Sequence, residues 1–387
     1  MVTHPVLPGT DDHLARFLDE VFSALPRCDQ RRWAGAYLHG LLTVRGRKSL
    51  RNLAGSVSAS STASQCLQQF ISASTWEWAP LRLAVARYAQ KSAAVEAWTV
   101  ATAAIPKRGE QSVGVRRRFV PELGRTLNCQ SAVGLFLATE AGSVPVDWRL
   151  RLDGPWALDA GRRRRARLPE HARPQPVWAD VLEMTAQLSA QLLPAPVVAD
   201  LRVVAASEQL VAGLADQELD FLVEISPDQE VLPRPGRHTS PRTALPRATG
   251  AATLARRTRD GIRPPGQAGH LPRSVPGTYG EQLVPCPVLV TLPRVPAALR
   301  MWAQWQPGRV RPARVWLTNL THARPQTVAR LIRHAGDRAA VAALEEDFGL
   351  LDFEGRSYPG WHHHMTMVSA ACAYRSLQGR SALAATA

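Results

Sequence analysis

The sequence predicts a mixed α/β fold that follows a helical N-terminal region. From about His13 to Gln90, apolar residues recur at spacings of three and four, which is the period of an amphipathic helix. After Lys91 the chain changes to short runs rich in Val, Leu and Trp with turn residues between them, a pattern typical of strands. Strands come first and then helices alternate with strands, which indicates a mixed sheet.

Short helices make up the expected N-terminal region, residues 1–90. One helix begins near His13 and ends before Pro26, because proline interrupts helical hydrogen bonding. Further helices are predicted over residues 29–42 and 64–72.

A basic segment, residues 44–54 (VRGRKSLRNLA), lies between these helices. Its basic side chains are Arg45, Arg47, Lys48 and Arg51. Short helices next to a basic stretch and a polar turn are compatible with a helix-turn-helix-like DNA-binding region. A helical bundle with a solvated basic face is the alternative, and the sequence leaves both open.

The sheet is expected to begin in residues 91–226. Strands are predicted at 95–101, 131–139 and 144–152, and the last two can form a hairpin. Helix and strand then alternate: a helix at 177–192, a strand at 197–200, a helix at 208–214 and a strand at 221–225.

Residues 227–287 differ from the rest in composition. They are rich in Pro, Arg, Gly, Ser and Thr with little periodicity, so we expect a basic linker or a poorly ordered insertion. Regular structure is predicted to resume in residues 288–387, with strands at 288–292 and 314–318, a helix from 326 to about 348 and a final helix from 363 to about 377.

The composition favours a cytoplasmic nucleic-acid-binding protein. The formal charge is +15, the electrostatic footprint expected of a DNA-binding surface, although an Arg- and Ala-rich composition also arises in GC-rich genomes. The five cysteines are scattered without a CxxC pair, which argues against a zinc site or a disulfide framework. No apolar stretch of about 18 residues predicts a membrane span, and the first residues do not resemble a signal peptide.

Residues 344–367, LEEDFGLLDFEGRSYPGWHHHMTM, carry the densest motif. This stretch resembles the last catalytic motif of bacterial insertion-sequence transposases of the DDE type. Residues 31–49, 67–82 and 105–130 are also similar to segments of that family. The resemblance implies a ribonuclease-H-like domain, DNA as the partner and cleavage and joining of DNA as the reaction.

The resemblance also implies a metal site. Transposases of this type use three carboxylates to hold two divalent ions, and Mg²⁺ prefers such oxygen ligands. By resemblance, Asp200 at the end of a strand is the second acid and Glu345 the third, with the neighbouring Glu346 a weaker choice. The helix that contains Glu345 is shorter than in the family by roughly two turns.

The first acid of the family motif is missing. Aligning the sequence on Pro106 and Lys107 places Ala101 where the family has Asp. Glu96 is expected on the opposite face of the strand, because side chains alternate along it. Asp147 lies on a different strand and is interpreted as structural.

Two hypotheses follow from these departures. One is a DNA-binding member of the transposase family that is impaired in catalysis because Ala101 replaces the first Asp. The other is an active Mg²⁺-dependent transposase with an unrecognised third carboxylate. Neither requires a membrane, and self-association into a homo-oligomer is compatible with both.

Other basic and titratable clusters are further candidates for binding. Three consecutive histidines, 362–364, point about 100° apart on a helix and are poorly placed to bind one ion, so a structural role or phosphate contact is predicted. The four arginines 162–165 could bind phosphates or form a solvated loop. The DNA-contact candidates are Arg45, Arg47, Lys48, Arg51, Lys107, Arg108, Arg116, Arg117 and Arg118.

Overall fold

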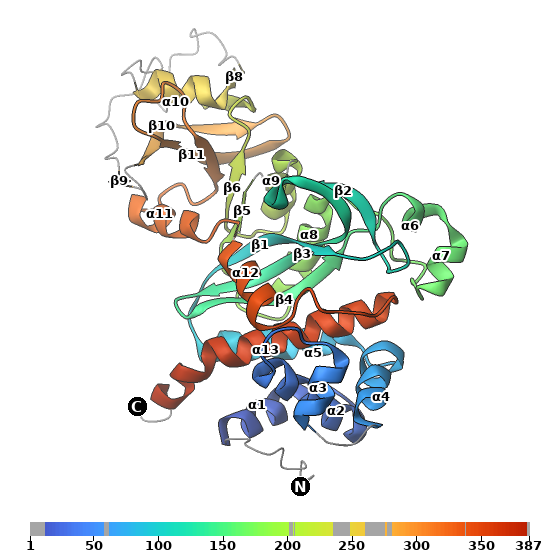
Figure 1. Ribbon diagram of the computed structural model, residues 1–387. Coiled ribbons are helices and arrows are strands. Elements are labelled where there is room, and N and C mark those ends of the chain that lie inside the picture. The colour runs from blue at the N-terminus through green and yellow to red at the C-terminus, as the bar shows by residue number, and fades with distance from the viewer. Residues whose placement is uncertain are drawn as a thin grey trace.

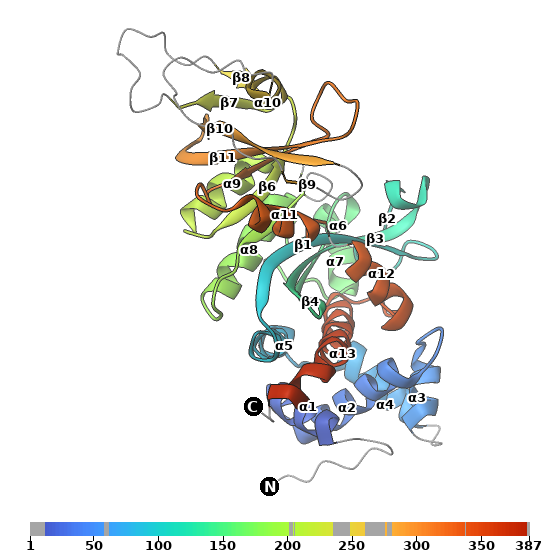
Figure 2. The ribbon, with the colours of Figure 1, turned by 90° about the vertical axis from the view of Figure 1, so that its left-hand side faces the viewer.

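The computed structural model describes residues 12–57, 62–200, 204, 206–234, 248–259, 275–276, 281–336 and 338–384. Helices from both ends of the chain pack together below a large mixed sheet (Figures 1 and 2). The long C-terminal helix α13, Tyr358–Ala384, lies between the sheet and the N-terminal helices in both views. The mixed α/β class predicted from the sequence is confirmed.

The N-terminal helices follow the predicted order. They are α1 (Asp12–Phe22), α2 (Cys28–Thr43), α3 (Leu50–Val57), α4 (Thr62–Gln68), a π-helical turn (Gln69–Ala73) and α5 (Trp78–Ser92). Aromatic contacts join α1 to its neighbours, because the ring of Phe17 meets Tyr88 of α5 edge-on and Tyr374 of α13. The region is therefore packed onto the C-terminal helix and shares its core.

The longest strands form one side of the sheet. The central strand β1 (Val95–Pro106) pairs antiparallel with β3 (Arg125–Thr139), which pairs on its other edge with β4 (Gly142–Leu150) and β2 (Arg116–Val120). On its opposite edge β1 pairs in parallel with β5 (Val197–Ala199), and β5 with β6 (Phe221–Ile225). The predicted hairpin between β3 and β4 is confirmed, whereas β2 was not predicted.

Several helices flank this part of the sheet. They are α6 (Pro155–Leu158), α7 (Ala160–Arg165), α8 (Val177–Ser189), α9 (Ser207–Asp216) and α11 (Pro325–Arg333). Helices α8 and α9 pack against each other and on β3 and β6, whereas the buried side chains of α11 join a second core cluster with Trp302 and Trp316. The sheet is therefore buried on both faces near β5 and β6.

A basic linker or a poorly ordered insertion was expected at 227–287, but the residues of this segment that the structure describes form regular elements. This part of the chain contains β7 (Glu230–Pro233), β8 (Thr249–Gly250), α10 (Ala251–Arg259), β9 (Val275–Pro276) and the beginning of β10 (Gln282–Leu292). With β11 (Val295–Trp305) and β12 (Arg314–Thr318) these strands extend the same sheet, because β12 pairs antiparallel with β6. Residues 235–247, 260–274 and 277–280 lie outside the described part. Composition was misleading because the pairing partners of these short strands are distant in sequence.

The predicted helix from 326 to 348 is two helices. Helix α11 ends at Arg333 and α12 covers Arg338–Asp347. Gly336 between them has φ +63, a left-handed conformation that glycine adopts without strain and that interrupts a helix. Helix α13 begins at Tyr358, ahead of the predicted start at His363.

The five cysteines are all free and differ in burial. Cys129, Cys286 and Cys372 are buried free thiols, but Cys28 is exposed and Cys66 half-buried. Within the described residues, no helix has the length and apolar character needed to cross a bilayer.

Candidate active site

The two predicted carboxylates meet in one cavity. This cavity, of about 480 Å³, lies between β1, the β2–β3 hairpin and α12. Asp200 and Glu345 line it, together with residues 101–104 of β1. The three positions that the sequence singled out, Ala101, Asp200 and Glu345, are therefore brought together by the fold.

Strand pairing explains why Ala101 and Asp200 are neighbours. Strands β1 and β5 run parallel, with Trp98 opposite Val197 and Thr99 opposite Val198. Continuing this register places Ala101 opposite Asp200, and residues in register on parallel strands share a face of the sheet. Ala101 is buried, so this part of the cavity has a methyl group where the family resemblance implies a carboxylate.

Asp200 is held by an arginine of the sheet. Its side chain is buried, and its Oδ2 lies 3.5 Å from the Nη2 of Arg314 on β12. The same guanidinium donates to both carboxylate oxygens of Glu224 on β6, at 2.9 and 2.7 Å. A buried carboxylate needs such a compensating charge, and here Arg314 provides it.

Glu345 has a different environment. It lies on α12 and is half-buried, and burial raises the pKa of its carboxyl group, with a smaller contribution from the charge of Glu346. Glu346 is exposed and does not line the cavity. Glu345 is thus the better of the two predicted candidates.

Neither Glu96 nor Asp147 lies where the family resemblance implies the first acid. Glu96 does not line the cavity, because its Oε2 lies 2.9 Å from Nε2 of His334 and 3.7 Å from Nε of Arg330 beside α11. Asp147 does not line the cavity either, and it binds Arg82 and Arg149 at 2.7 and 2.6 Å. The structural interpretation of Asp147 fits these contacts.

The residues of the cavity do not fit a pair of Mg²⁺ ions. Its lining offers two carboxylates, one of them in contact with Arg314, and two further arginines, Arg118 and Arg338. Across the described residues, no three His, Cys, Asp or Glu side chains are grouped so that they could hold one metal ion. A two-metal mechanism needs convergent oxygen ligands, which this set does not supply.

A sequence profile of DDE superfamily endonucleases matches residues 20–267. The chain belongs to this family. No curated protein matches the sequence. The match covers α2 to α5, the central strand with Ala101 and strand β5 with the following Asp200, whereas most of α1 and Glu345 lie outside it.

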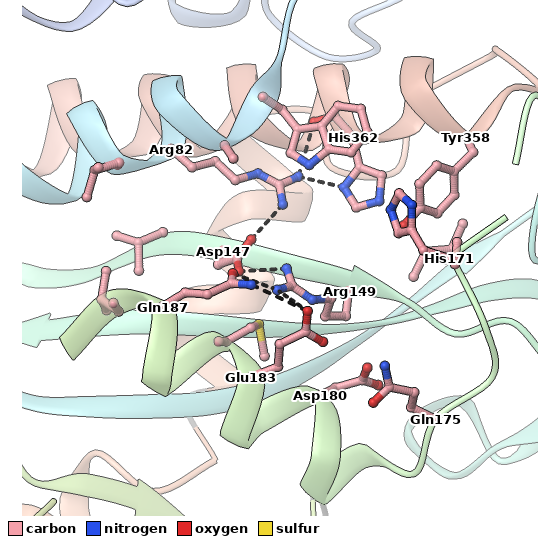
Figure 3. Close-up of a pocket in the computed structure, with 18 of the residues that line it drawn as sticks. Arg82, Asp147, Arg149, His171, Gln175, Asp180, Glu183, Gln187, Tyr358 and His362 are labelled. Carbon is pink, nitrogen blue, oxygen red and sulfur yellow. Dashed lines mark hydrogen bonds and ion pairs between the residues drawn. The ribbon is translucent and has the colours of Figure 1, made fainter. Parts of the chain in front are cut away.

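A second cavity of this member of the DDE superfamily, about 580 Å³, lies between α5, β4, α8 and α13 (Figure 3). Arg82 crosses its wall and donates to Asp147 at 2.7 Å, to Thr366 at 2.8 Å and to Nδ1 of His362 at 3.0 Å. Arg149 donates to the other oxygen of Asp147 at 2.6 Å. The charges of this wall are paired with one another, which favours a structural role in joining the helices to the sheet.

The three histidines are part of this helical core. All three are buried and face different neighbours, as expected from their spacing of about 100°. The ring of His362 stacks on Trp78 at 4.5 Å, and that of His363 on Trp76 at 3.8 Å. Their burial contradicts direct contact with DNA phosphates and agrees with the structural alternative.

The DNA-contact candidates separate into exposed and buried groups. Lys48 is buried and its ammonium donates to the carbonyl of Val44, so it is unavailable to a phosphate. Lys107 is half-buried, donates to the carbonyl of Phe353, and has its pKa lowered to about 8 by burial. The expectation of surface contact was wrong for Lys48, because its side chain closes the loop between α2 and α3.

The remaining candidates form what we call the basic strip. It comprises Arg45, Arg47, Arg51, Arg108, Arg116 and Arg117, all of them exposed. Contacts through neighbouring residues connect its parts. Arg47 pairs with Glu354 at 2.7 Å, and Lys107 donates to the carbonyl of the adjacent Phe353. The backbone amide of Lys107 also donates to the carbonyl of Asn128, which lies opposite Arg117 in the pairing of β2 with β3. Arg118 shares a face of β2 with Arg116, and both pair with Asp153, at 3.2 and 3.4 Å.

Some residues of the site were not predicted from the sequence. Arg314 is one of them, although a single charge in the apolar strand RVWLT is a pattern that can indicate a buried ion pair. Phe119 and Leu123 also line the cavity. Because the sequence pattern did not predict β2, nothing in the sequence marked these two residues as part of the site. Of the four arginines 162–165, Arg163 donates to three backbone carbonyls and so acts structurally.

Proposed function

We propose that this chain binds DNA and is impaired in metal-dependent cleavage and strand transfer. The observation that carries the proposal is the composition of the cavity. Ala101 stands opposite Asp200, and Asp200 contacts a guanidinium. A site with two carboxylates, one of them in contact with a guanidinium, binds divalent ions poorly.

A ribonuclease-H-like core is part of this proposal. It is supported by the strand order β4-β3-β1-β5-β6, in which the first three strands are antiparallel and β5 and β6 run parallel to β1. In this arrangement the carboxylates belong at the end of β5 and on a helix that packs near β1. Asp200 and Glu345 occupy such positions.

DNA is the proposed partner because of the basic strip. When exposed arginines neutralise DNA phosphates, counterions are released from the DNA. This release favours binding to DNA of any base sequence. The strip borders the cavity, since Arg116 and Arg117 are in the same strand as the lining residues Arg118 and Phe119. Bound DNA would therefore lie across the mouth of the cavity.

A nicking assay tests the loss of catalysis. Supercoiled plasmid is incubated with the full chain and Mg²⁺ or Mn²⁺, and relaxed DNA is quantified. We expect no metal-dependent nicking above that of buffer alone, because the third ligand is missing.

The variant Asp200→Asn is the matched control, since it keeps the shape of the side chain but removes its charge. Nicking by the wild-type chain that requires metal and disappears in Asp200→Asn would support an active transposase with another third carboxylate. That result would contradict the impaired-catalysis proposal.

A further inference from the structure

The second cavity, of about 580 Å³ between α5, β4, α8 and α13, shares no lining residue with the candidate active site. Its volume is within the range of sites that bind small molecules. Apolar side chains form much of its lining, namely Leu83, Val146, Leu150, Leu152, Met184 and Leu188. Helices from both ends of the chain therefore border, together with the sheet, a partly apolar space at their junction.

Two guanidinium groups form one wall of this space (Figure 3). Arg82 and Arg149, which we call the guanidinium wall, are 3% and 18% exposed and donate to opposite oxygens of Asp147 at 2.7 and 2.6 Å. Two positive charges share one carboxylate, so the wall keeps an excess of one positive charge. Burying such an excess costs free energy unless an anion compensates it.

The other charged groups of the lining do not remove this excess. Asp180 is buried and forms its own ion pair with Arg151 at 3.1 Å, so that pair is neutral. Glu183 approaches the guanidinium wall only to 3.9 Å and is 45% exposed, so water weakens its effect. His171 and Arg173 are exposed in the lining, and neither adds a negative charge. The charges of the cavity therefore favour an anion.

The ring of His362 presents an unpaired hydrogen-bond donor beside this wall. Arg82 donates to its Nδ1 at 3.0 Å, and a guanidinium cannot accept, so Nδ1 has the lone pair and Nε2 the proton. Burial and the charge of Arg82 hold the pKa of His362 well below its usual value, so the ring stays neutral. Its Nε2 is buried and has no hydrogen-bond partner among the described residues. Buried donors nearly always have an acceptor, so an acceptor from outside the chain is expected here.

The hydroxyl of Tyr358, at the beginning of α13, is a second donor at this site. Tyr358 lines the cavity, and none of the described residues accepts a hydrogen bond from its hydroxyl. Burial raises the pKa of Tyr358, so the group remains a donor at neutral pH. The positive charges of Arg149 and Arg82 act on this pKa more strongly than the nearby carboxylates do. A negative charge is therefore stabilised next to the hydroxyl.

We propose that this cavity binds a small monoanion with an apolar body, an aryl or alkyl carboxylate. Its carboxylate accepts from the hydroxyl of Tyr358 and lies in the positive field of the guanidinium wall and of the His362 N–H group. Its apolar body covers lining side chains such as Leu150 and Met184. The chain thus gains a small-molecule site that is separate from the surface proposed for DNA.

Three probes with the same ring system test the charge of the ligand. They are naphthylacetate, the neutral naphthylacetamide and the cationic naphthylethylammonium, and isothermal titration calorimetry of the full chain gives their affinities. We expect the carboxylate to bind at least about tenfold more tightly than the amide, and the ammonium to bind most weakly. Equal affinities for carboxylate and amide, no binding of the carboxylate at millimolar concentration, or tighter binding of the ammonium would overturn the proposal.

Substitutions locate the bound carboxylate. Tyr358→Phe keeps the ring and removes only the hydroxyl, so naphthylacetate should lose about fivefold in affinity and the amide less. Tyr88→Phe is the matched control, because Tyr88 is a buried tyrosine of α5 that does not line the cavity. Ala79→Trp, at an exposed position of the lining, should weaken carboxylate and amide alike by filling the space. Unchanged affinities in both lining variants, with folding verified by circular dichroism, would contradict this location.

Competition with DNA separates this site from the proposed function. A paired duplex should bind equally well with and without saturating naphthylacetate, because the cavity and the basic strip have no residue in common. Displacement of naphthylacetate by the duplex would identify the anion as a DNA phosphate and overturn the small-molecule site. Failure of the chain to bind any duplex at low salt would contradict the proposed DNA binding, whereas the naphthylacetate affinities would still test the cavity.

Discussion

At the scale of the residue, burial decides the chemistry of the histidine cluster. His364 is fully enclosed, and its two ring nitrogens have different partners. The carbonyl of Gly349 accepts from Nε2 at 3.0 Å, and the hydroxyl of Tyr37 donates to Nδ1 at 2.9 Å. This arrangement requires a neutral ring, because a protonated ring would have no acceptor left for the tyrosine hydroxyl.

Protonation of His364 should therefore destabilise the fold in acid. Burial lowers its pKa to about 3, whereas an unfolded histidine has a pKa of about 6.5. Between these values the unfolded chain binds more protons, so stability rises with pH and is lost as the pH falls from about 6.5 towards 3. The free energy of unfolding should fall by about 1.4 kcal/mol per pH unit in the middle of this window from this group alone.

Urea titrations at several pH values measure this dependence. His364→Gln retains a donor and an acceptor but does not titrate, so its stability should depend less steeply on pH than that of the wild type. His322→Gln is the control, because His322 is exposed. Identical pH slopes for His364→Gln and the wild type would contradict the assignment.

At the scale of the element, glycines determine where the C-terminal helices end. Helix α12 ends beside Gly349, which has φ +69 and lets the amide of Leu350 bond to the carbonyl of Leu344 at 3.0 Å. A β-carbon at Gly349 would lie 2.9 Å from the β-carbon of Lys48. The turn after α12 therefore fits closely against the loop between α2 and α3.

Gly349→Ala should destabilise the protein through both backbone strain and this close contact. Gly308→Ala is the matched control, because Gly308 has φ +72 but a β-carbon added there would meet only open space. We expect Gly308→Ala to cost about 1 kcal/mol and Gly349→Ala roughly 2 kcal/mol or more. Chemical denaturation measures both, and equal losses would show that the packing around Gly349 relaxes without cost.

At the scale of the whole molecule, the formal charge of +15 is the property most relevant to DNA. Part of it is used internally, since Arg82, Arg163 and Arg314 bind groups within the protein. The basic strip is the exposed remainder that borders the cavity. The fold thus separates structural arginines from those available to a partner.

Binding to paired DNA should weaken steeply with salt, because phosphate contacts release counterions. Arg117→Ala and Arg51→Ala should each reduce the slope of log K against log salt by about 1. Arg87→Ala is the control, since Arg87 is exposed on α5 outside the strip and donates to Gln191. A binding constant independent of salt would exclude the basic strip as the DNA-binding surface.

The sequence by itself determined the helical beginning, the strands from β1 to β6 apart from β2, and the residues that meet at the candidate site. Hydrophobic periodicity and short apolar runs predict local helices and strands. The resemblance to the family motif indicates which residues lie together at the candidate site. The family resemblance singled out Ala101 and Asp200, which the strand register places opposite each other.

Only the tertiary structure decided what surrounds those residues. The contact between Arg314 and Asp200, the exposed ring of Phe119 and the addition of β7 to β12 to the same sheet all depend on pairings between distant segments. The structure likewise shows that Lys48 is buried, whereas the arginines near it in the sequence are exposed. Local pattern does not encode these outcomes, because the energy of a charge or a ring depends on which groups the fold places next to it.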